Sequence, residues 1–325
     1  MQKIVTCLIA GIAVAGLAVT TSRADDYPTK PVTFIVPFPP GGLVDFTARP
    51  VAAALERVWK QPAVIANRPG AGGGVGIVAA GTARPDGYTL LFAHPSITSV
   101  PASDVVLGRK PSFDREQYVP IARFVADPLI LVVKGDSPFK TFKDVVDAAR
   151  KEPGSVSYSS SGAYGAVHLP FEMAAHAAGV KFKHVAYTGG GPALTAVLGN
   201  HVQMTMGSPS VLAPQIKSGA IRPLLNTGAK RVALLPDVPT VYDLGYKDAE
   251  FYLWVGLFGS AKIPAETIAK VRDGVAKAVK DPEFIQQLQK MQLPVEYQDG
   301  PDFDKFWKAD AERIEAAIKR IGKVE

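Results

Sequence analysis

The sequence predicts an α/β protein of two domains, with mostly parallel sheets flanked by helices and a hinge between the domains. Strand-like and helix-like segments alternate along the chain, which is typical of parallel sheets covered by helices. The 325 residues are more than one hydrophobic core comfortably organises. The composition, 47% hydrophobic and 20% charged, is that of a folded globular protein and excludes a disordered one.

The first half of the chain alternates short β-rich runs with longer amphipathic segments. Helical spacing places Leu55, Val58 and Trp59 on one stripe of a predicted helix. Asp127 and Pro128 separate two apolar runs that we interpret as consecutive strands. In chain order, we expect strands over 32–36, 63–65, 89–93, 119–125 and 129–133, and helices over 44–59 and 75–82.

Capping signals define several elements of the second half. Thr141 and Asp144 have the spacing of a capping box, with Asp in the Glu position. Pro192 is expected at the first position of a helix, and Asp281 caps another. We expect strands over 156–158, 182–187, 202–206, 221–225 and 252–258, and helices over 141–150, 167–178, 192–198, 265–279, 282–291 and 303–321.

The domain boundaries follow from where the chain can cross between two sheets. We expect crossings within 126–129 and 245–252, so that the last helices return to the first domain. Domain 1 is then 25–127 plus 253–325, and domain 2 is 128–252. Two crossing strands form a hinge that suits closure around a ligand.

The N-terminus has the features of a secretory signal peptide. Lys3 precedes an apolar run over 4–19, and Ser22 and Ala24 are small residues at the positions that a signal peptidase reads. We expect residues 1–24 to be removed and the protein to reach the periplasm. The alternative is a membrane anchor, for which the run is at the lower limit of length.

Cysteine content and charge exclude several classes of protein. Cys7 is the single cysteine and lies inside the signal, so the mature chain has no disulfide and no thiolate to act as nucleophile or metal ligand. The formal charge of +6 falls to +4 without Lys3 and Arg23. Because the basic residues are scattered and no nucleic-acid motif is present, we expect no nucleic-acid partner. The mild positive charge either helps to attract anions or only keeps the protein in solution.

The segment over 37–45 is the most informative loop, because it follows a strand and leads into a helix. This position is the carboxyl edge of an open α/β sheet, where ligands bind. Its prolines stiffen the loop without offering N–H groups, and its glycines allow close approach. The amides over 41–44 then form an anion site at the positive end of the helix. We expect Asp45 to cap loop amides, since a carboxylate would repel an anion. The candidate ligand-binding residues here are Phe38, Pro40, Gly41, Gly42, Leu43 and Asp45.

Two further strand–glycine–helix loops lie in the predicted second domain. The segment over 159–165 supplies hydroxyls and amides, with His168 in the first turn of its helix, and the segment over 188–191 is glycine-rich. Together with the first loop they indicate opposing jaws around a ligand. The candidates in these loops are Ser160, Ser161, Gly162, Ala163, His168, Thr188 and Gly189. His94 and Ser96 join them, because they follow the strand over 89–93 at the same edge as the first loop.

Catalytic and cofactor motifs are weak. The segment over 70–76 has the glycine spacing of a dinucleotide fingerprint but lacks its strand register and acidic partner, so we interpret it as a turn and helix start. No histidine pair has a recognised metal spacing, and no Gly-x-Ser-x-Gly elbow is present. We therefore expect no metal, cofactor or catalytic residue. The alternative is an exported hydrolase that uses His94 or His168 with a serine.

With these loops in view, the chain resembles the Bug-type receptors, the substrate-binding proteins of tripartite tricarboxylate transporters. The resemblance runs from about Tyr27 to the C-terminus and rests on motifs that occur together and in order. These are Tyr27-Pro28-Thr29-Lys30-Pro31, Pro37-Phe38-Pro39-Pro40-Gly41-Gly42 with Asp45, Asn67-Arg68-Pro69-Gly70-Ala71-Gly72-Gly73, Pro85-Asp86-Gly87-Tyr88-Thr89-Leu90-Leu91, Ser160-Ser161-Gly162 with His168-Leu169, Gly190-Gly191-Pro192-Ala193-Leu194, and Leu235-Pro236-Asp237-Val238-Pro239-Thr240 with Gly245-Tyr246.

The resemblance implies a periplasmic binding protein fold, type II-like, whose lobes enclose a small organic carboxylate, often with ordered water. It also implies delivery to the membrane permease subunits of a tripartite transporter, or a sensory role toward a membrane kinase, and we expect a monomer. This sequence departs from the family at Pro40 and at His94. It departs again after the strand over 202–206, where many members place an Asp and Gly207-Ser208-Pro209-Ser210 follows here, and Ser208 is a further candidate ligand-binding residue. The loss of that acid favours a plain mono- or dicarboxylate, possibly aromatic, over an amino acid.

Overall fold

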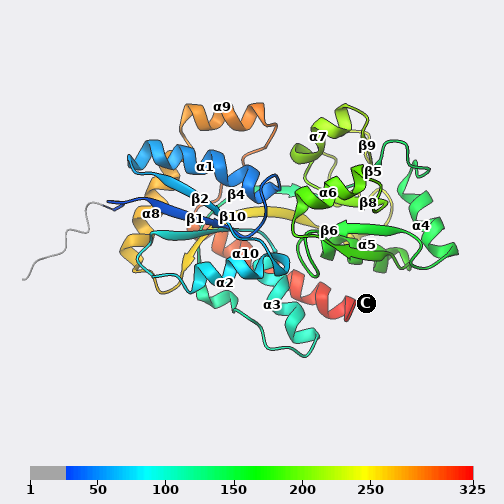
Figure 1. Ribbon diagram of the computed structural model, residues 1–325, viewed down its shortest axis with the longest axis horizontal. Coiled ribbons are helices and arrows are strands. Elements are labelled where there is room, and N and C mark those ends of the chain that lie inside the picture. The colour runs from blue at the N-terminus through cyan, green and yellow to red at the C-terminus, as the bar shows by residue number, and fades with distance from the viewer. Residues whose placement is uncertain (1–26, 325) are drawn as a thin grey trace, which may run out of the picture.

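The computed structural model describes residues 27–324, and the predicted signal peptide with Cys7 lies outside this range. The described residues form two lobes, each built on a five-stranded sheet flanked by helices (Figure 1). The predicted two-lobe α/β fold is therefore confirmed. No helix within residues 27–324 combines the length and apolar character that a membrane crossing needs.

Lobe 1 is built on the sheet with strand order β2-β1-β3-β10-β4. Its strands are β1 (Val32–Val36), β2 (Ala63–Asn67), β3 (Thr89–Ala93), β4 (Tyr118–Pro128) and β10 (Tyr252–Ser260). Its helices are α1 (Leu43–Trp59), α2 (Gly74–Gly81), α3 (Ser96–Val106), α8 (Ala265–Ala278), α9 (Pro282–Lys290) and α10 (Gly300–Ile321). Helix α1 packs against α8 and α9, whereas α10 packs against α3 and β4.

Lobe 2 is built on the sheet with strand order β7-β6-β8-β5-β9. Its strands are β5 (Ile130–Lys134), β6 (Ser157–Ser160), β7 (Lys183–Ala186), β8 (Met204–Gly207) and β9 (Ile221–Asn226). Its helices are α4 (Phe142–Lys151), α5 (His168–Ala178), α6 (Gly190–Leu198) and α7 (Pro209–Lys217). The loops that end β6 and β8 therefore lead into helices, as the loop after β1 does in lobe 1.

Both sheets are mixed, so the expectation of mostly parallel sheets holds for only half of the strand pairs. Strand β1 is parallel to β2 and β3, and β6 is parallel to β7 and β8. Strand β10 is antiparallel to β3 and β4, and β5 is antiparallel to β8 and β9. The reason is the two-lobe path, because β4 runs toward the second lobe and β10 returns beside it.

Two helices and two helix starts differ from the sequence prediction, since α10 begins at Gly300, three residues before the predicted start. Helices α3 and α7 were not predicted, since both contain an internal proline and α3 is rich in Ser, Thr and Val, which favour helix weakly. Tertiary packing compensates, for example through the buried Ile97 and Leu212. Helix α6 begins at Gly190, so the prediction of Pro192 at its first position is wrong. A proline is tolerated there because the first four amides of a helix have no helical partner.

The chain passes between the sheets at Leu129 and again just before β10, and Thr227 lies between the two passages. The Thr227 amide donates to the Leu129 carbonyl at 2.9 Å, and the Phe251 amide donates to the Thr227 carbonyl at 2.9 Å. The Thr227 hydroxyl accepts from the Leu129 amide at 2.8 Å and donates to the Phe251 carbonyl at 2.7 Å. This fully buried residue therefore joins both connecting segments.

Replacing Thr227 with Val should destabilise the protein by about 3 kcal/mol, because it leaves the Leu129 amide and the Phe251 carbonyl buried without one partner each. Thr227→Ser keeps the hydroxyl and should retain most of the stability. Urea unfolding of the two variants measures the difference. Equal free energies of unfolding for both variants would show that the hydroxyl does not join the segments.

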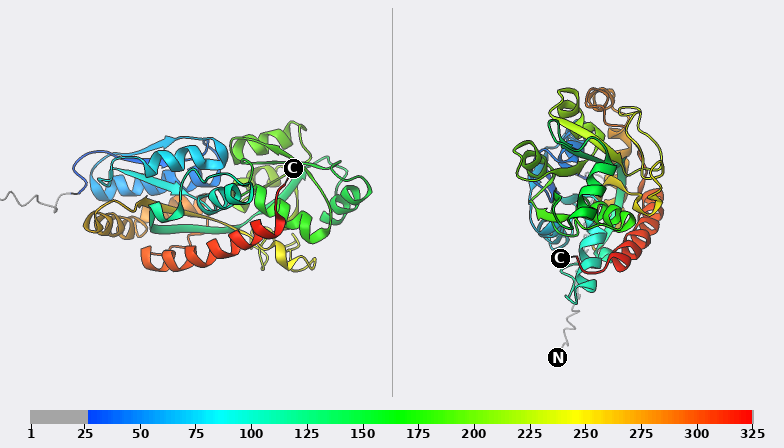
Figure 2. Two further views of the ribbon diagram at one scale, coloured as in Figure 1. Left: turned by 90° about the horizontal axis from the view of Figure 1, so that it is seen from below. Right: turned by 90° about the vertical axis from the view of Figure 1, so that its right-hand side faces the viewer.

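The C-terminal helix forms a third link between the lobes. Figure 2 shows α10 running along lobe 1 toward lobe 2, where it contacts α5. Beyond its end, the Val324 amide donates to the Tyr164 hydroxyl at 3.0 Å, and that hydroxyl donates to the Gly322 carbonyl at 3.3 Å. The C-terminus thus contacts the loop that connects β6 to α5.

Candidate functional site

A cavity of about 40 Å³ lies where the two lobes meet. This volume holds about three water molecules, so a carboxylate of several carbons fits only after the lobes separate or side chains move. Fifteen residues line it: Phe38, Gly42, Leu43, Val44, His94, Ser161, Val167, Gly190, Leu194, Met206, Gly207, Ser208, Val211, Leu212 and Leu253. None of these lining residues, all within the described part of the chain, is Asp, Glu, Lys or Arg.

The start of α1 contributes backbone amides to the cavity. Gly42 is the N-cap of α1, and Leu43 and Val44 form its first turn, whose amides have no helical acceptor. An ideal Cβ on Gly42 would lie 3.9 Å from the amide nitrogen of Gly190, the first residue of α6. Two helix starts, one from each lobe, therefore meet at one side of the cavity, where their amides favour an anion.

Asp45 stabilises the loop before α1 and does not line the cavity. Its carboxylate accepts from the Gly41 amide at 3.2 Å and forms an ion pair with Arg49 at 2.8 Å. The Asn67 amide group also donates to it at 3.1 Å. Asp45 therefore caps a loop amide, as predicted. The Gly41 N–H, which was predicted to bind the ligand, already donates to Asp45.

Ser161 brings an unpaired hydroxyl of lobe 2 to the cavity. It follows β6, its exposed fraction is 3%, and its Oγ has no hydrogen-bond partner within residues 27–324. Buried polar atoms are nearly always paired, so a lone hydroxyl in a cavity needs an explanation. A bound acceptor would provide the missing partner.

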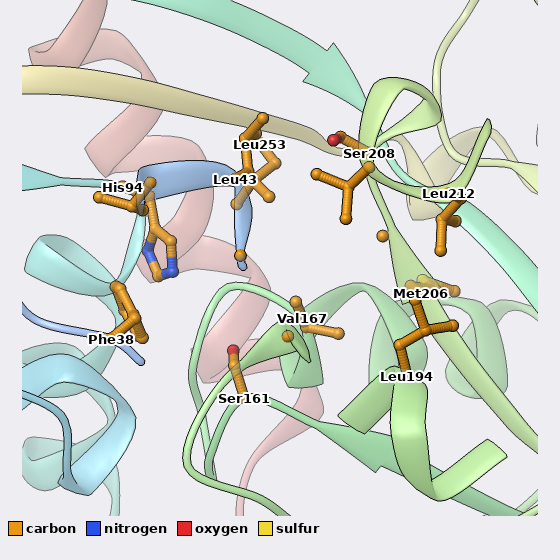
Figure 3. A pocket seen from close by; sticks show the side chains of 15 residues that line it. Phe38, Leu43, His94, Ser161, Val167, Leu194, Met206, Ser208, Leu212 and Leu253 are labelled. Atoms are coloured by element: carbon orange, nitrogen blue, oxygen red, sulfur yellow. The ribbon is translucent and has the colours of Figure 1, made fainter. Parts of the chain in front are cut away.

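His94 faces the cavity from lobe 1 as a neutral imidazole. The Ser96 amide donates to its Nδ1 at 3.2 Å, so the ring proton lies on Nε2, which has no partner among the described residues. Burial lowers the pKa of His94 to about 3, although a backbone hydrogen bond opposes this change. The ring stacks on Phe38 with centroids 4.2 Å apart, and Figure 3 shows both side chains on one side of the cavity. His94 can therefore donate one hydrogen bond without carrying charge.

The opposite side of the cavity is apolar. Figure 3 shows Leu194, Met206 and Leu212 across from His94, with Val167 between the two sides. Most of these side chains come from the elements that surround β8 in lobe 2. The cavity thus has one side rich in hydrogen-bond donors and one side that is mostly hydrocarbon.

The structure brings six of the sixteen predicted site residues to the cavity: Phe38, Gly42, Leu43, His94, Ser161 and Ser208. The other ten do not line it: Pro40, Gly41, Asp45, Ser96, Ser160, Gly162, Ala163, His168, Thr188 and Gly189. Ser96 is buried beside His94, and its hydroxyl lacks a partner among the described residues. Ala163 and Thr188 are exposed.

Gly162 and Gly189 allow the two lobes to touch. A Cβ on Gly162 would lie 2.8 Å from Cα of Gly72, and one on Gly189 would lie 2.5 Å from Cδ of Pro39. Both contacts join lobe 2 to lobe 1, so a side chain at either glycine would hold the lobes apart. Both glycines were predicted to bind the ligand, but in the structure they allow the backbones of the two lobes to approach each other closely.

Two histidines of lobe 2, His168 and His184, pack against each other. His168 accepts from the Tyr164 amide at 3.0 Å, and its ring lies 4.1 Å from that of His184. Burial and, next, His184 lower the pKa of His168 to about 3, and burial lowers the pKa of His184 to about 4. Ser160 shares a hydrogen bond of 2.7 Å with His184, but neither residue lines the cavity. A hydrolase would need a serine hydroxyl hydrogen-bonded to its histidine. Among the described residues, His94 and His168 each accept from a backbone amide, and neither bonds to a serine hydroxyl.

Several apolar lining residues were not predicted from the sequence, most of them in lobe 2 and Leu253 on β10 of lobe 1. Val167, Leu194, Val211, Leu212 and Leu253 have the pattern of ordinary core residues, and α7 was not predicted. One signal was available, because Gly207 ends a strand and Ser208-Pro209 begin a helix, which is the arrangement of the three loops that were selected.

The chain is similar to known proteins over most of its length. The family model described as "Tripartite tricarboxylate transporter family receptor" matches residues 47–323. A UPF0065 protein of Cupriavidus necator is 30% identical, with 96% of each chain covered. Protein BugT of Bordetella pertussis is 30% identical, with 88% of this chain and 87% of BugT covered.

The chain is also similar to solved structures. The periplasmic binding protein BugD is 27% identical with a TM-score of 0.84, covering 91% of this chain and 99% of BugD. The R. palustris protein Rpa4515 with adipate is 27% identical with a TM-score of 0.83, covering 91% and 99%. From the family match and the shared fold, the chain belongs to the receptor family of tripartite tricarboxylate transporters.

Proposed function

We propose that this receptor binds a small organic carboxylate between its lobes and delivers it to the membrane permease subunits of a tripartite transporter. The observation that carries the proposal is the unpartnered, buried Ser161 hydroxyl in a cavity whose polar groups are all uncharged. Family membership and the solved structure of Rpa4515 with adipate support the same ligand class.

The binding mode follows from the donors at the cavity. One carboxylate oxygen accepts from Ser161, and the other faces the amides of Gly42, Leu43 and Val44 at the start of α1. Hydrogen bonds to a charged group contribute roughly 1.5–3 kcal/mol each, so a few of them support micromolar binding. The absence of a lining Lys or Arg among the described residues leaves recognition to backbone amides, hydroxyl groups and the neutral imidazole of His94.

Closure accompanies binding in this proposal. Residues 25–127 with 253–325 move as one domain and 128–252 as the other, about the segments that Thr227 joins. Receptors of this family work in the periplasm, which fits a monomer exported through a signal peptide over residues 1–24. A sensory role toward a membrane kinase uses the same cavity, whereas a hydrolase would need a serine–histidine pair at the cavity, and the described residues form none there.

Ser161→Ala should weaken carboxylate binding about tenfold or more, because it removes a hydrogen bond to a charged group. Isothermal titration calorimetry with adipate and with hexanoate measures the affinities. Ser159→Ala is the matched control, since this buried hydroxyl donates to the Ala193 carbonyl and does not line the cavity. Unchanged affinity in Ser161→Ala, or turnover of a model ester at the cavity, would contradict the proposal.

A further inference from the structure

We infer that the ligand carries a single carboxylate on an apolar body, so that this receptor prefers a monocarboxylate over a dicarboxylate or an amino acid. The inference rests on the proposed function and specifies its ligand class. It is carried by the unequal distribution of polar groups around the cavity.

The donor side of the cavity has room for one anionic group. Ser161 Oγ, His94 Nε2–H and the amides at the starts of α1 and α6 all lie on this side. The Gly42–Gly190 approach brings both helix starts to the same point, so they act on one carboxylate and not on two separated ones.

Among the described residues, the far side offers a second carboxylate no charged partner and few hydrogen-bond donors. Leu194, Met206 and Leu212 form this wall, and no cation lines it within residues 27–324. The start of α7 is also at this side, but Pro209 at its first position has no N–H and the Ser208 hydroxyl already shares a hydrogen bond with Ser210 at 3.2 Å, which leaves the amides of Ser210 and Val211 as its donors. A second carboxylate there would exchange its hydration for at most these two amides and no cation, which is unfavourable.

An amino acid is disfavoured as well, because its positively charged ammonium group finds no negatively charged partner among the described lining residues. Its ammonium group needs an acceptor, ideally a carboxylate, and no Asp or Glu of the described chain lines the cavity. Asp45, the nearest acid to the α1 start in sequence, is already paired with Arg49. An alkyl or aryl body, in contrast, gains by burial against the leucines and Met206.

Calorimetry with matched pairs of equal carbon number tests the inference: butyrate against succinate, hexanoate against adipate, and hexanoate against norleucine. We expect the monocarboxylate of each binding pair to have an affinity at least about tenfold higher. Tighter binding of the dicarboxylate or amino acid would overturn the inference and leave the proposed function intact. If none of these acids binds, the proposed function itself is wrong.

A charge placed at the apolar wall gives an independent test. Val211 is half-buried on α7 and lines the cavity, so a lysine there can reach both the cavity and solvent. Val211→Lys should raise the affinity for adipate relative to hexanoate about tenfold or more, whereas Val211→Met, of similar length and uncharged, should leave that ratio unchanged. An equal change of the ratio in both variants would contradict the placement of the ligand's far end against this wall.

Discussion

Gly42→Val is expected to abolish carboxylate binding while the protein stays folded. The backbone of Gly42 has φ −90° and ψ 168°, an extended conformation that valine adopts without strain. Its side chain would point between the two helix starts, since the Cβ lies 3.9 Å from the Gly190 amide nitrogen. Because the cavity measures only about 40 Å³, two added methyl groups would occupy the carboxylate position. Calorimetry should show a loss of affinity of roughly 100-fold or more.

Gly41→Ala provides the contrast. Gly41 has φ +89°, where a side chain is strained, but its Cβ would meet nothing within 4 Å. This variant should lower thermal stability by the strain, on the order of 1 kcal/mol, and retain most of the affinity. Wild-type affinity in Gly42→Val would remove the α1 start from the binding site.

The second large effect concerns Asp127, which should make the stability of the protein fall as the pH rises from about 4 to 7. Asp127 lies on β4 close to the passage between the lobes, with an exposed fraction of 4% and an Oδ2 that has no partner among the described residues. Burial and, second, the charge of Glu296 raise the pKa of its carboxyl to about 7. Lys230 and Arg231 line the same groove, and Arg231 pairs with Asp243.

The direction of this pH effect follows from how many protons the folded and unfolded states bind. The folded protein holds the proton on Asp127 up to pH of about 7, whereas the unfolded chain releases it near 3.8. Between these values the folded state binds more protons, so raising the pH favours unfolding, by about 4 kcal/mol over the whole interval. The stabilisation is complete below the unfolded pKa and is lost as the pH passes the folded one.

Urea unfolding of the wild type and of Asp127→Asn at pH 5 and pH 8 measures this effect. Asn keeps the size and stays neutral, so the variant should lose this part of the pH dependence and be more stable than the wild type at pH 8. Other groups titrate equally in both proteins, so the difference between them isolates Asp127. Parallel stability profiles for the two proteins would show that Asp127 titrates normally.

The sequence predicted those parts of the fold that have strong local signals. Alternating apolar runs located every strand, and the capping box at Thr141 and the Asp281 cap occur as predicted. Helices α3 and α7 escaped prediction because packing, and not local propensity, stabilises them. The mixed sheets could not be read from the sequence, since strand direction depends on which strands carry the chain between lobes.

The candidate site also contains some residues that could be predicted from the sequence and others that could not. Gly42, Leu43 and Ser161 were predicted because a loop between a strand and a helix places its amides and hydroxyls at the sheet edge. Gly162 and Gly189 follow the same pattern, but the structure uses them where the lobes touch. Leu194 and Leu212 could not be distinguished from core residues, because an apolar side chain has the same pattern whether it faces a core or a ligand.

A crystal structure of the protein with the carboxylate that binds most tightly tests the central claim most directly. We expect the carboxylate between the lobes, with one oxygen within about 3.2 Å of Ser161 Oγ and the other within about 3.2 Å of an amide at the start of α1. The hydrocarbon part should lie against Leu212 and Met206. A carboxylate bound by lysine or arginine side chains on the outer surface, with Ser161 still unpartnered, would contradict the account.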